Sequence, residues 1–238
     1  SKIRKSPKDM KKKRYIKQKK LRNRLAIPIV ILITAVTVLC AVKICQIIFP
    51  SDLEYGYIPT SYGKHISKNV KLAQDLQLPD WVDKQIISVH STARTGAHLN
   101  DIKNIVIHYV GNPKTTAQNN RDYYEKKDTE VSSHFVVGLK GEVIQCVPLW
   151  EKSAASNERN GDTISIEVCH PDESGKFNDE TYNSVVELTA WLCETFDLDE
   201  DDVIRHYDIT EKICPKYYVE NPKEWKKFKE DVENKLNE

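Results

Sequence analysis

The segment "NIVIHYVGNP", residues 104–113, consists of an apolar run followed by residues typical of a turn. Residues 104–110 are mostly apolar and rich in β-branched side chains, and Gly111 ends the run, which is typical of a buried β-strand. A run of this kind has both faces covered, as happens in sheets that lie between layers of helices. The segment therefore predicts a buried strand with His108 close to its end.

Strand and helix patterns alternate on the C-terminal side of this segment. The predicted strands are residues 104–110, two strands within 133–148 that are joined around Lys140 and Gly141, 162–169 and 203–207. The predicted helices are residues 115–127, 178–196 and 221–236, and 178–196 carries Val185, Leu188, Trp191 and Leu192 at helical spacing. This alternation predicts the fold class α/β, with a single mixed β-sheet flanked by helices.

The first 24 residues form a basic tail with 13 Lys and Arg side chains against one acidic residue, Asp9. Of the chain's 36 basic and 35 acidic side chains, residues 25–238 keep 23 basic and 34 acidic ones, so the bulk of the chain is acidic. The short tail is the one strongly basic segment that could bind nucleic acid, and we expect no nucleic-acid partner.

A transmembrane helix is predicted directly after the tail, over residues 25–49. The part "LAIPIVILITAVTVLCAV", residues 25–42, carries no charge, and it would form about 27 Å of helix against a hydrocarbon core of roughly 30 Å. Dense positive charge before the span predicts a cytoplasmic N-terminus and an extracytoplasmic domain in a single-pass protein of the cell membrane. A cleaved signal peptide is the alternative, although the apolar run is long for one and lacks a small-x-small cleavage site.

The remaining chain divides into a predicted tether and a predicted domain. Residues 50–85 are polar and mixed without sustained periodicity, so we interpret them as a tether that lifts the domain off the membrane. Residues 86–238 carry the alternating strand and helix patterns.

The six cysteines do not suggest a disulfide framework. Cys40 and Cys45 belong to the predicted span, whereas Cys146, Cys169 and Cys193 each lie in an apolar run and are predicted to be small core residues.

The segment "VIRHYDITEKICPKYY", residues 203–218, places His206 and Cys214 at the two ends of a polar loop. His206 ends a predicted strand, as His108 does, and ligands in α/β domains gather at such strand ends. Two imidazoles and one thiolate would leave the fourth position of Zn²⁺ open, as a catalytic site requires. A lone histidine and cysteine at this spacing more often have structural roles, so the pattern by itself leaves zinc binding open.

From about residue 90 onward, the chain resembles the zinc-dependent N-acetylmuramoyl-L-alanine amidases, the group that includes phage lysozyme-like amidases and peptidoglycan recognition proteins. The segments that carry the resemblance are "NIVIHYVGNP", "VSSHFVVGLKGEVIQCVP", "DTISIEVC" and "VIRHYDITEKICP", which follow one another in the order of the family. The resemblance implies that His108, His206 and Cys214 bind Zn²⁺.

The resemblance also implies roles for residues around the metal. Glu167 matches the proton-transferring carboxylate, Lys212 matches a basic residue near the reacting carbonyl, and His134 is a candidate for lining the site and binding the substrate. Two departures remove expected contacts: Ser133 stands where some relatives carry a tyrosine, and "KSAASNERNGD", residues 152–162, replaces a Trp-His pair.

The function implied by this resemblance is a peptidoglycan hydrolase that cleaves the amide between N-acetylmuramic acid and the L-alanine of the stem peptide. Glu167 would accept a proton from the attacking water, and Lys212 would stabilise the oxyanion. A module that binds peptidoglycan without cutting it is one alternative, although such relatives typically lack the cysteine. A cysteine hydrolase with Cys214 as nucleophile and His206 as base is another.

Overall fold

The computed structural model describes residues 66–89 and 92–238, and its central feature is a six-stranded sheet. The strands are β1 (Val82–Lys84), β2 (Asn104–Tyr109), β3 (Phe135–Val137), β4 (Val143–Gln145), β5 (Thr163–Val168) and β6 (Val203–Arg205). Their order in the sheet is β1-β4-β3-β5-β2-β6. Only β3 and β4 pair antiparallel, so the sheet is mixed as predicted.

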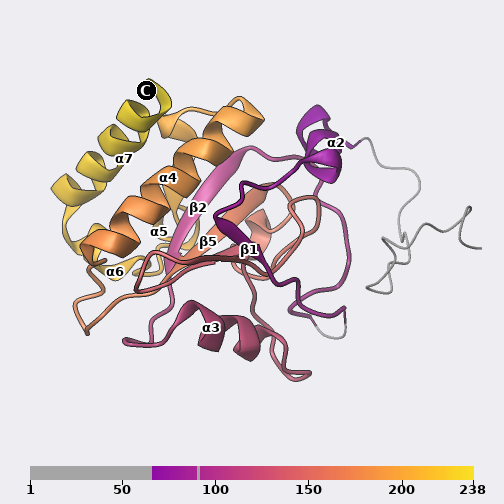
Figure 1. The fold of residues 1–238 in the computed structure, drawn as a ribbon, viewed down its shortest axis with the longest axis horizontal. Coiled ribbons are helices and arrows are strands. Elements are labelled where there is room, and N and C mark those ends of the chain that lie inside the picture. The colour runs from indigo at the N-terminus through magenta and orange to yellow at the C-terminus, as the bar shows by residue number, and fades with distance from the viewer. Residues whose placement is uncertain (1–65, 90–91) are drawn as a thin grey trace, which may run out of the picture. The chain divides into compact units, whose positions relative to one another are not determined.

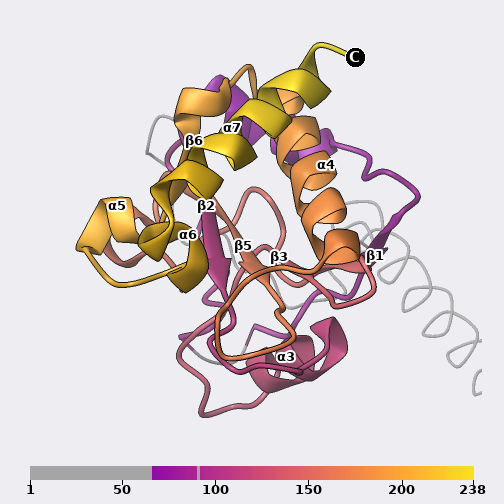
Figure 2. The same ribbon diagram turned by 90° about the vertical axis from the view of Figure 1, so that its left-hand side faces the viewer.

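Helices cover both faces of this sheet. They are α2 (Lys68–Asp75), α3 (Ala117–Tyr124), α4 (Asp179–Phe196), α5 (Tyr207–Thr210), α6 (Lys216–Glu220) and α7 (Pro222–Leu236), with single 3₁₀ turns at Asn157–Arg159 and Glu200–Asp202. Figures 1 and 2 show α4 and α7 side by side on one face of the sheet and α3 on the other. The predicted α/β class is confirmed.

The helix α4 illustrates why these residues fold as they do. Asn178 caps its first turn by accepting a hydrogen bond from the backbone of Thr181. Val185, Leu188 and Leu192 then recur at helical spacing and are fully buried in the larger core cluster, as the sequence pattern predicts. Burying side chains of this kind contributes about 1.5–3 kcal/mol each, before the entropy cost of ordering them.

The register of β2 and β5 decides which side chains meet on each face of the sheet. The two strands are parallel, with Ile107 opposite Ile166 and His108 opposite Glu167. Because side chains alternate along a strand, the two isoleucines face the core under α4, whereas His108 and Glu167 share the other face. A one-residue slip would exchange the two sets, so burial of the isoleucines fixes the position of the polar pair.

The folded domain begins before the predicted boundary at residue 86. Val70 and Ala73 of α2 and Val82 of β1 are buried in the larger core cluster, and β1 extends the sheet by pairing with β4. The side chain of Asn69 donates a hydrogen bond of 2.8 Å to the carbonyl of Phe196 at the end of α4. The part of the predicted tether that the structure describes, residues 66–85, is therefore integral to the domain.

Within residues 66–89 and 92–238, none of the helices is both long and apolar enough to span a bilayer. The predicted basic tail (1–24), the predicted transmembrane helix (25–49) and the first part of the predicted tether (50–65) lie outside the described residues.

A buried ion pair joins the segment before β2 to the segment after β4. The guanidinium of Arg94 donates to both carboxylate oxygens of Glu151, at 2.8 and 2.7 Å, and also to the carbonyl of Ile87. Arg94 and Glu151 are 3% and 1% exposed. Removing one member of such a pair leaves the other charge buried without its counter-ion.

Glu151→Ala is therefore expected to lower the free energy of unfolding by about 3–5 kcal/mol. Replacing both residues by apolar ones, as in Arg94→Met with Glu151→Leu, is expected to cost much less, because no charge is left in the interior. Urea unfolding of both variants against the wild type measures the difference. A Glu151→Ala protein as stable as the wild type would show that the pair adds nothing to stability.

Candidate metal centre

His108, His206 and Cys214 come from three points of the chain that the sheet brings together. His108 is the next-to-last residue of β2. The strand β6, which ends at Arg205, pairs with β2 in parallel. The backbone N–H of His206 extends that ladder to the carbonyl of Ile107, which places His206 beside His108. The chain then passes through the short helix α5 and returns, because the backbone N–H of Tyr207 donates to the carbonyl of Cys214 at 3.0 Å.

The possible ligand atoms of these three residues form a tight group. One ligand atom from each lies within 4.8 Å of the others, and Cys214 Sγ is 3.8 Å from His108 Nδ1. All three residues are buried, at 1%, 4% and 2% exposure for His108, His206 and Cys214. The convergence predicted from the two strand ends is thus present, and the group could hold a metal ion.

Hydrogen bonds indicate which nitrogen of His206 is unprotonated and which nitrogen of His108 faces Cys214. His206 Nε2 lies 2.8 Å from Asn157 Oδ1, and an amide oxygen only accepts, so Nε2 carries the proton. Its Nδ1 is then an unprotonated, buried atom without a hydrogen-bond partner. His108 Nε2 lies 3.4 Å from the hydroxyl of Ser156, while its Nδ1 faces Cys214. A buried lone pair without a partner is costly unless a cation occupies the space beside it.

The electrostatics of the group favour the protonation states that a metal requires. Burial lowers the pKa of His108 well below its usual value, and His206 and Lys212 lower it further. Burial and then Lys212 also lower the pKa of His206, so both imidazoles are neutral at physiological pH. Burial, aided by Glu167, raises the pKa of the Cys214 thiol to about 12. A bound cation reverses that last shift by favouring the thiolate, so this donor set suits a metal of the zinc type.

Glu167 faces the same space from the neighbouring strand β5. Its Oε1 is 4.0 Å from His108 Nδ1, its Oε2 is buried without a hydrogen-bond partner, and the side chain as a whole is 19% exposed. Burial raises the pKa of this carboxyl group to about 8, and the charge of Lys212 partly opposes the rise. Lys212 itself is exposed, and its charge also lowers the pKa of both histidines.

His134 does not line the site, contrary to the sequence-based expectation of a substrate contact. The residue is fully buried, its Nδ1 accepts the backbone N–H of Ser165 at 3.0 Å, and its Nε2 donates to the carbonyl of Glu151 at 2.9 Å. Both ring nitrogens are therefore used inside the protein, where they tie the start of β3 to β5 and to the segment after β4. The histidine has a structural role.

Two residues at the site escaped sequence reasoning, Ser156 and Asn157. They lie in residues 152–162, the segment in which the Trp-His pair is missing. Asn157 has a φ of 51°, a left-handed conformation that asparagine tolerates better than most residues. The only local signal is the asparagine itself within a polar loop, and it does not point to a particular histidine.

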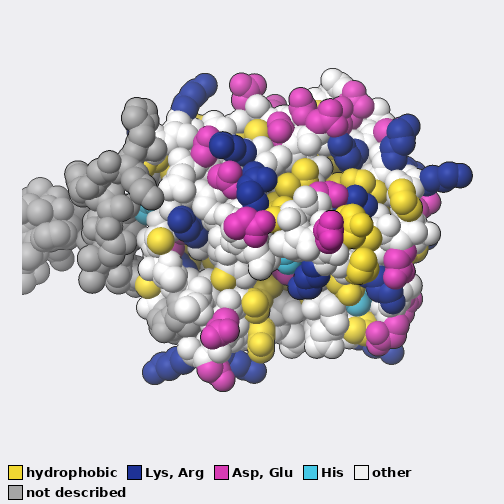
Figure 3. Space-filling view, turned by 180° about the vertical axis from the view of Figure 1, so that it is seen from behind, with side chains coloured by type: hydrophobic (Ala, Val, Ile, Leu, Met, Phe, Trp, Pro, Cys, Tyr) yellow, Lys and Arg dark blue, Asp and Glu magenta, His cyan; other side chains and the backbone are white. Residues whose placement is uncertain are grey.

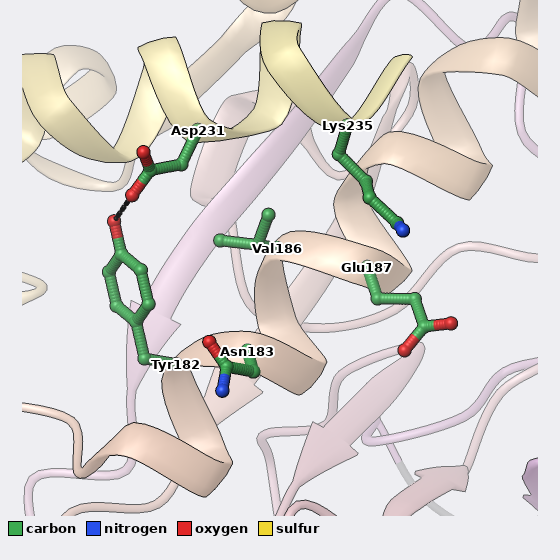
Figure 4. A pocket seen from close by; sticks show the side chains of 6 residues that line it. All are labelled: Tyr182, Asn183, Val186, Glu187, Asp231 and Lys235. Carbon is green, nitrogen blue, oxygen red and sulfur yellow. Dashed lines mark hydrogen bonds between the residues drawn. The ribbon is translucent and has the colours of Figure 1, made fainter. Parts of the chain in front are cut away.

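Little histidine surface is exposed on the face shown in Figure 3, where small histidine patches lie among hydrophobic and basic side chains. A separate hollow of about 290 Å³ lies between α4 and α7 (Figure 4). It is lined by Tyr182, Asn183, Val186, Glu187, Asp231 and Lys235. The hydroxyl of Tyr182 donates to Asp231 across it at 2.5 Å, so these polar groups already pair with each other. The hollow lies away from the buried His-His-Cys group.

The four cysteines of the described residues are all buried and free. Cys146, Cys169 and Cys193 are fully buried and belong to the two apolar core clusters, as predicted. Cys214 alone lies beside two histidines and a carboxylate.

Known proteins are similar to this chain in sequence. The sequence profile of the Amidase_2 family, described as N-acetylmuramoyl-L-alanine amidase, matches residues 98–217. The chain is 32% identical over 172 residues to N-acetylmuramoyl-L-alanine amidase BlyA of Bacillus subtilis, covering 63% of this chain and 46% of BlyA. It is 30% identical over 172 residues to the amidase CwlL of Bacillus licheniformis, covering 65% of this chain and 47% of CwlL. The chain thus spans about half the length of the curated relatives it matches.

Solved structures have the same fold. A mutant endolysin from Bacillus subtilis aligns with a TM-score of 0.56 and 24% identity, covering 63% of this chain and 97% of the endolysin. PlyL aligns with a TM-score of 0.57 and 23% identity, covering 64% of this chain and 96% of PlyL. The profile match spans half of the 238 residues and includes His108, His206 and Cys214. The chain therefore belongs to the N-acetylmuramoyl-L-alanine amidase family Amidase_2.

Proposed function

We propose that this protein is a zinc-dependent N-acetylmuramoyl-L-alanine amidase, which hydrolyses the amide between N-acetylmuramic acid and the L-alanine of the peptidoglycan stem peptide. The observation that carries the proposal is the convergence of two neutral imidazoles and a thiol within 4.8 Å, with the half-buried carboxylate of Glu167 beside them. The family and the names of the curated relatives supply the substrate.

His108, His206 and Cys214 would hold the zinc ion. Three protein ligands leave one position open, as in catalytic zinc sites. Bound zinc supplies a Lewis acid, which polarises a carbonyl group and acidifies water. The remaining work falls to side chains of this chain, because an amide also needs a proton acceptor for the attacking water and a proton donor for the departing amine.

Glu167 is suited to that proton transfer. Its unpartnered Oε2 can accept a hydrogen bond from water, and a pKa raised to about 8 lets the group both take and return a proton near neutral pH. Lys212 carries a positive charge that acts on Glu167 and on both histidines. The same charge would stabilise negative charge that develops on the carbonyl oxygen in the transition state.

A cysteine hydrolase is disfavoured by the state of Cys214. The thiolate is the nucleophile in such enzymes, and activated cysteines have lowered pKa values. Here burial raises the pKa of Cys214 to about 12. The imidazole nitrogen in contact with its sulfur belongs to His108, at 3.8 Å, and not to His206 as that mechanism would require.

We propose further that the domain works outside the cytoplasm, attached by the apolar segment of residues 25–49. The support is the uncharged run of 18 residues after a tail with 13 basic residues. Peptidoglycan lies on that side of the membrane. Membrane fractionation with protease protection of intact cells tests this placement, and release of the protein into the soluble fraction would contradict it.

Mass analysis of muropeptides after digestion with the purified full-length protein tests the reaction. We expect free peptides that begin with L-alanine, with the glycan left intact. Cleavage between sugars would refute the assignment, and tight muropeptide binding by the fully metallated protein without amine release would favour a binding module instead.

Removal of the metal is expected to abolish this activity. A chelator should reduce the release of L-alanine-headed peptides to background, and Zn²⁺ should restore it, because the thiolate and imidazole ligands suit zinc. Mg²⁺ should fail to restore activity, since it prefers oxygen ligands and six-fold coordination. Thiol alkylation of the metallated protein is the control. A cysteine hydrolase would lose its activity on alkylation and keep its activity in the presence of a chelator.

A further inference from the structure

Two consecutive residues of one loop each contact the Nε2 atom of one of the two imidazoles in the buried group. His206 Nε2 contacts Asn157 Oδ1 at 2.8 Å, and His108 Nε2 contacts Ser156 Oγ at 3.4 Å. His108 Nδ1 therefore faces Cys214 Sγ at 3.8 Å and Glu167 Oε1 at 4.0 Å, whereas His206 Nδ1 is buried without a hydrogen-bond partner.

We propose that Asn157 is a positioning residue for the metal centre, which fixes the tautomer and the ring orientation of His206, while Ser156 more weakly restricts the rotation of His108. Without an acceptor at Nε2, the proton of a neutral histidine is free to move to Nδ1, the nitrogen that must stay unprotonated to bind a cation. Partners that hold the outer nitrogen of a ligating histidine also restrict its rotation.

The loop that carries these residues is itself fastened. Asn160 Oδ1 accepts the backbone N–H groups of Ala155 and Ser156, at 3.0 and 2.6 Å. The guanidinium of Arg159 donates to Asp162 at 2.8 Å and to the side chain of Asn104 at 2.6 Å, which attaches the loop to the starts of β5 and β2. The loop that carries Asn157 is thus held by a network anchored on the same two strands that position His108 and Glu167.

The two contacts differ in strength. The 2.8 Å contact of Asn157 is within the normal range for a hydrogen bond, whereas the 3.4 Å contact of Ser156 is long. Asn157 also sits at a φ of 51°, which glycine adopts freely and alanine does not. Asn157→Gly therefore deletes the carboxamide without adding backbone strain, and it is the variant of choice.

The inference rests on the proposed metal-dependent function, and it is tested by zinc affinity rather than by turnover. Full-length wild type, Asn157→Gly, Asn157→Asp and Ser156→Ala are titrated with Zn²⁺ against a chromogenic chelator. We expect Asn157→Gly to bind zinc roughly 10- to 100-fold more weakly. Asn157→Asp should match or exceed the wild type, since a carboxylate accepts the same hydrogen bond more strongly. Ser156→Ala should lose less than Asn157→Gly.

The melting temperature of each metal-free protein separates positioning from folding. If Asn157→Gly lowers that temperature but binds zinc as tightly as the wild type, the residue is merely structural and the inference is wrong. The inference is also wrong if Asn157→Asp binds as weakly as Asn157→Gly. A wild type that binds no zinc would overturn the metal-dependent function itself, together with this inference, whereas equal affinities in all four proteins would overturn the inference alone.

Discussion

Cys214→Ser is expected to abolish amide hydrolysis, because it replaces the one soft ligand of the group by a hydroxyl that zinc binds poorly. Removing a residue that hydrogen-bonds to a metal ligand lowers the metal affinity roughly 10- to 100-fold. Removing a ligand itself should lower the zinc affinity by more. Zinc content after dialysis and the release of L-alanine-headed peptides measure the two effects. The fold should persist, since the substitution nearly conserves volume.

The matched control for this variant is Cys193→Ser. Cys193 is also a free, fully buried cysteine, but it lies on α4 in the core that covers the other face of the sheet. We expect it to lose some stability and to keep both zinc and activity. Full activity of Cys214→Ser, or equal losses in the two variants, would show that Cys214 is an ordinary core residue.

Glu167→Gln is expected to lower kcat by about 10²- to 10⁴-fold while zinc stays bound, because glutamine keeps the shape of the side chain but cannot accept a proton. Glu173→Gln is the control, since Glu173 is an exposed carboxylate a few residues further along the same segment. Steady-state kinetics and zinc content are measured on both. A Glu167→Gln protein with wild-type kcat would remove the carboxylate from the mechanism, and one that loses zinc would assign it to metal binding.

The same carboxylate predicts a pH dependence. A general base works only when it is ionised, so kcat/KM should fall as the pH drops through the pKa of Glu167. Burial raises that pKa to about 8, and the positive charges of Lys212 and of a bound cation favour the ionised form. The acidic limb should therefore have its midpoint below about 8, and the residual activity of Glu167→Gln should lack it.

Much of the fold follows from local patterns in the sequence. The helix predicted over residues 178–196 is α4, Asp179–Phe196, and the strand predicted over 162–169 is β5, Thr163–Val168. Apolar periodicity and capping residues act over a few positions, so they are visible without tertiary contacts. The segment that became α2 and β1 was missed because its apolar side chains are few, and they are buried only by distant parts of the chain.

The candidate site likewise has features that the sequence shows and features that only the structure shows. The motifs around His108, His206 and Cys214 show imidazole and thiol donors near strand ends, and the family resemblance identifies these three as the possible ligands. His134 stands in an equally suggestive motif, yet the fold turns both of its nitrogens inward to Ser165 and Glu151. Sequence reasoning cannot tell these outcomes apart, since each depends on which backbone groups lie within hydrogen-bonding distance.

The sequence by itself thus determined the α/β class through periodicity, and it placed His108 and His206 at strand ends. The family resemblance added the assignment of His108, His206 and Cys214 as ligands and of Glu167 as the proton-transferring carboxylate. Only the tertiary structure decided which nitrogen of His206 carries the proton, and it did so through Asn157. The physical reason is that the tautomer is set by the acceptor at the opposite nitrogen, and that acceptor comes from a loop about 50 residues earlier in the chain.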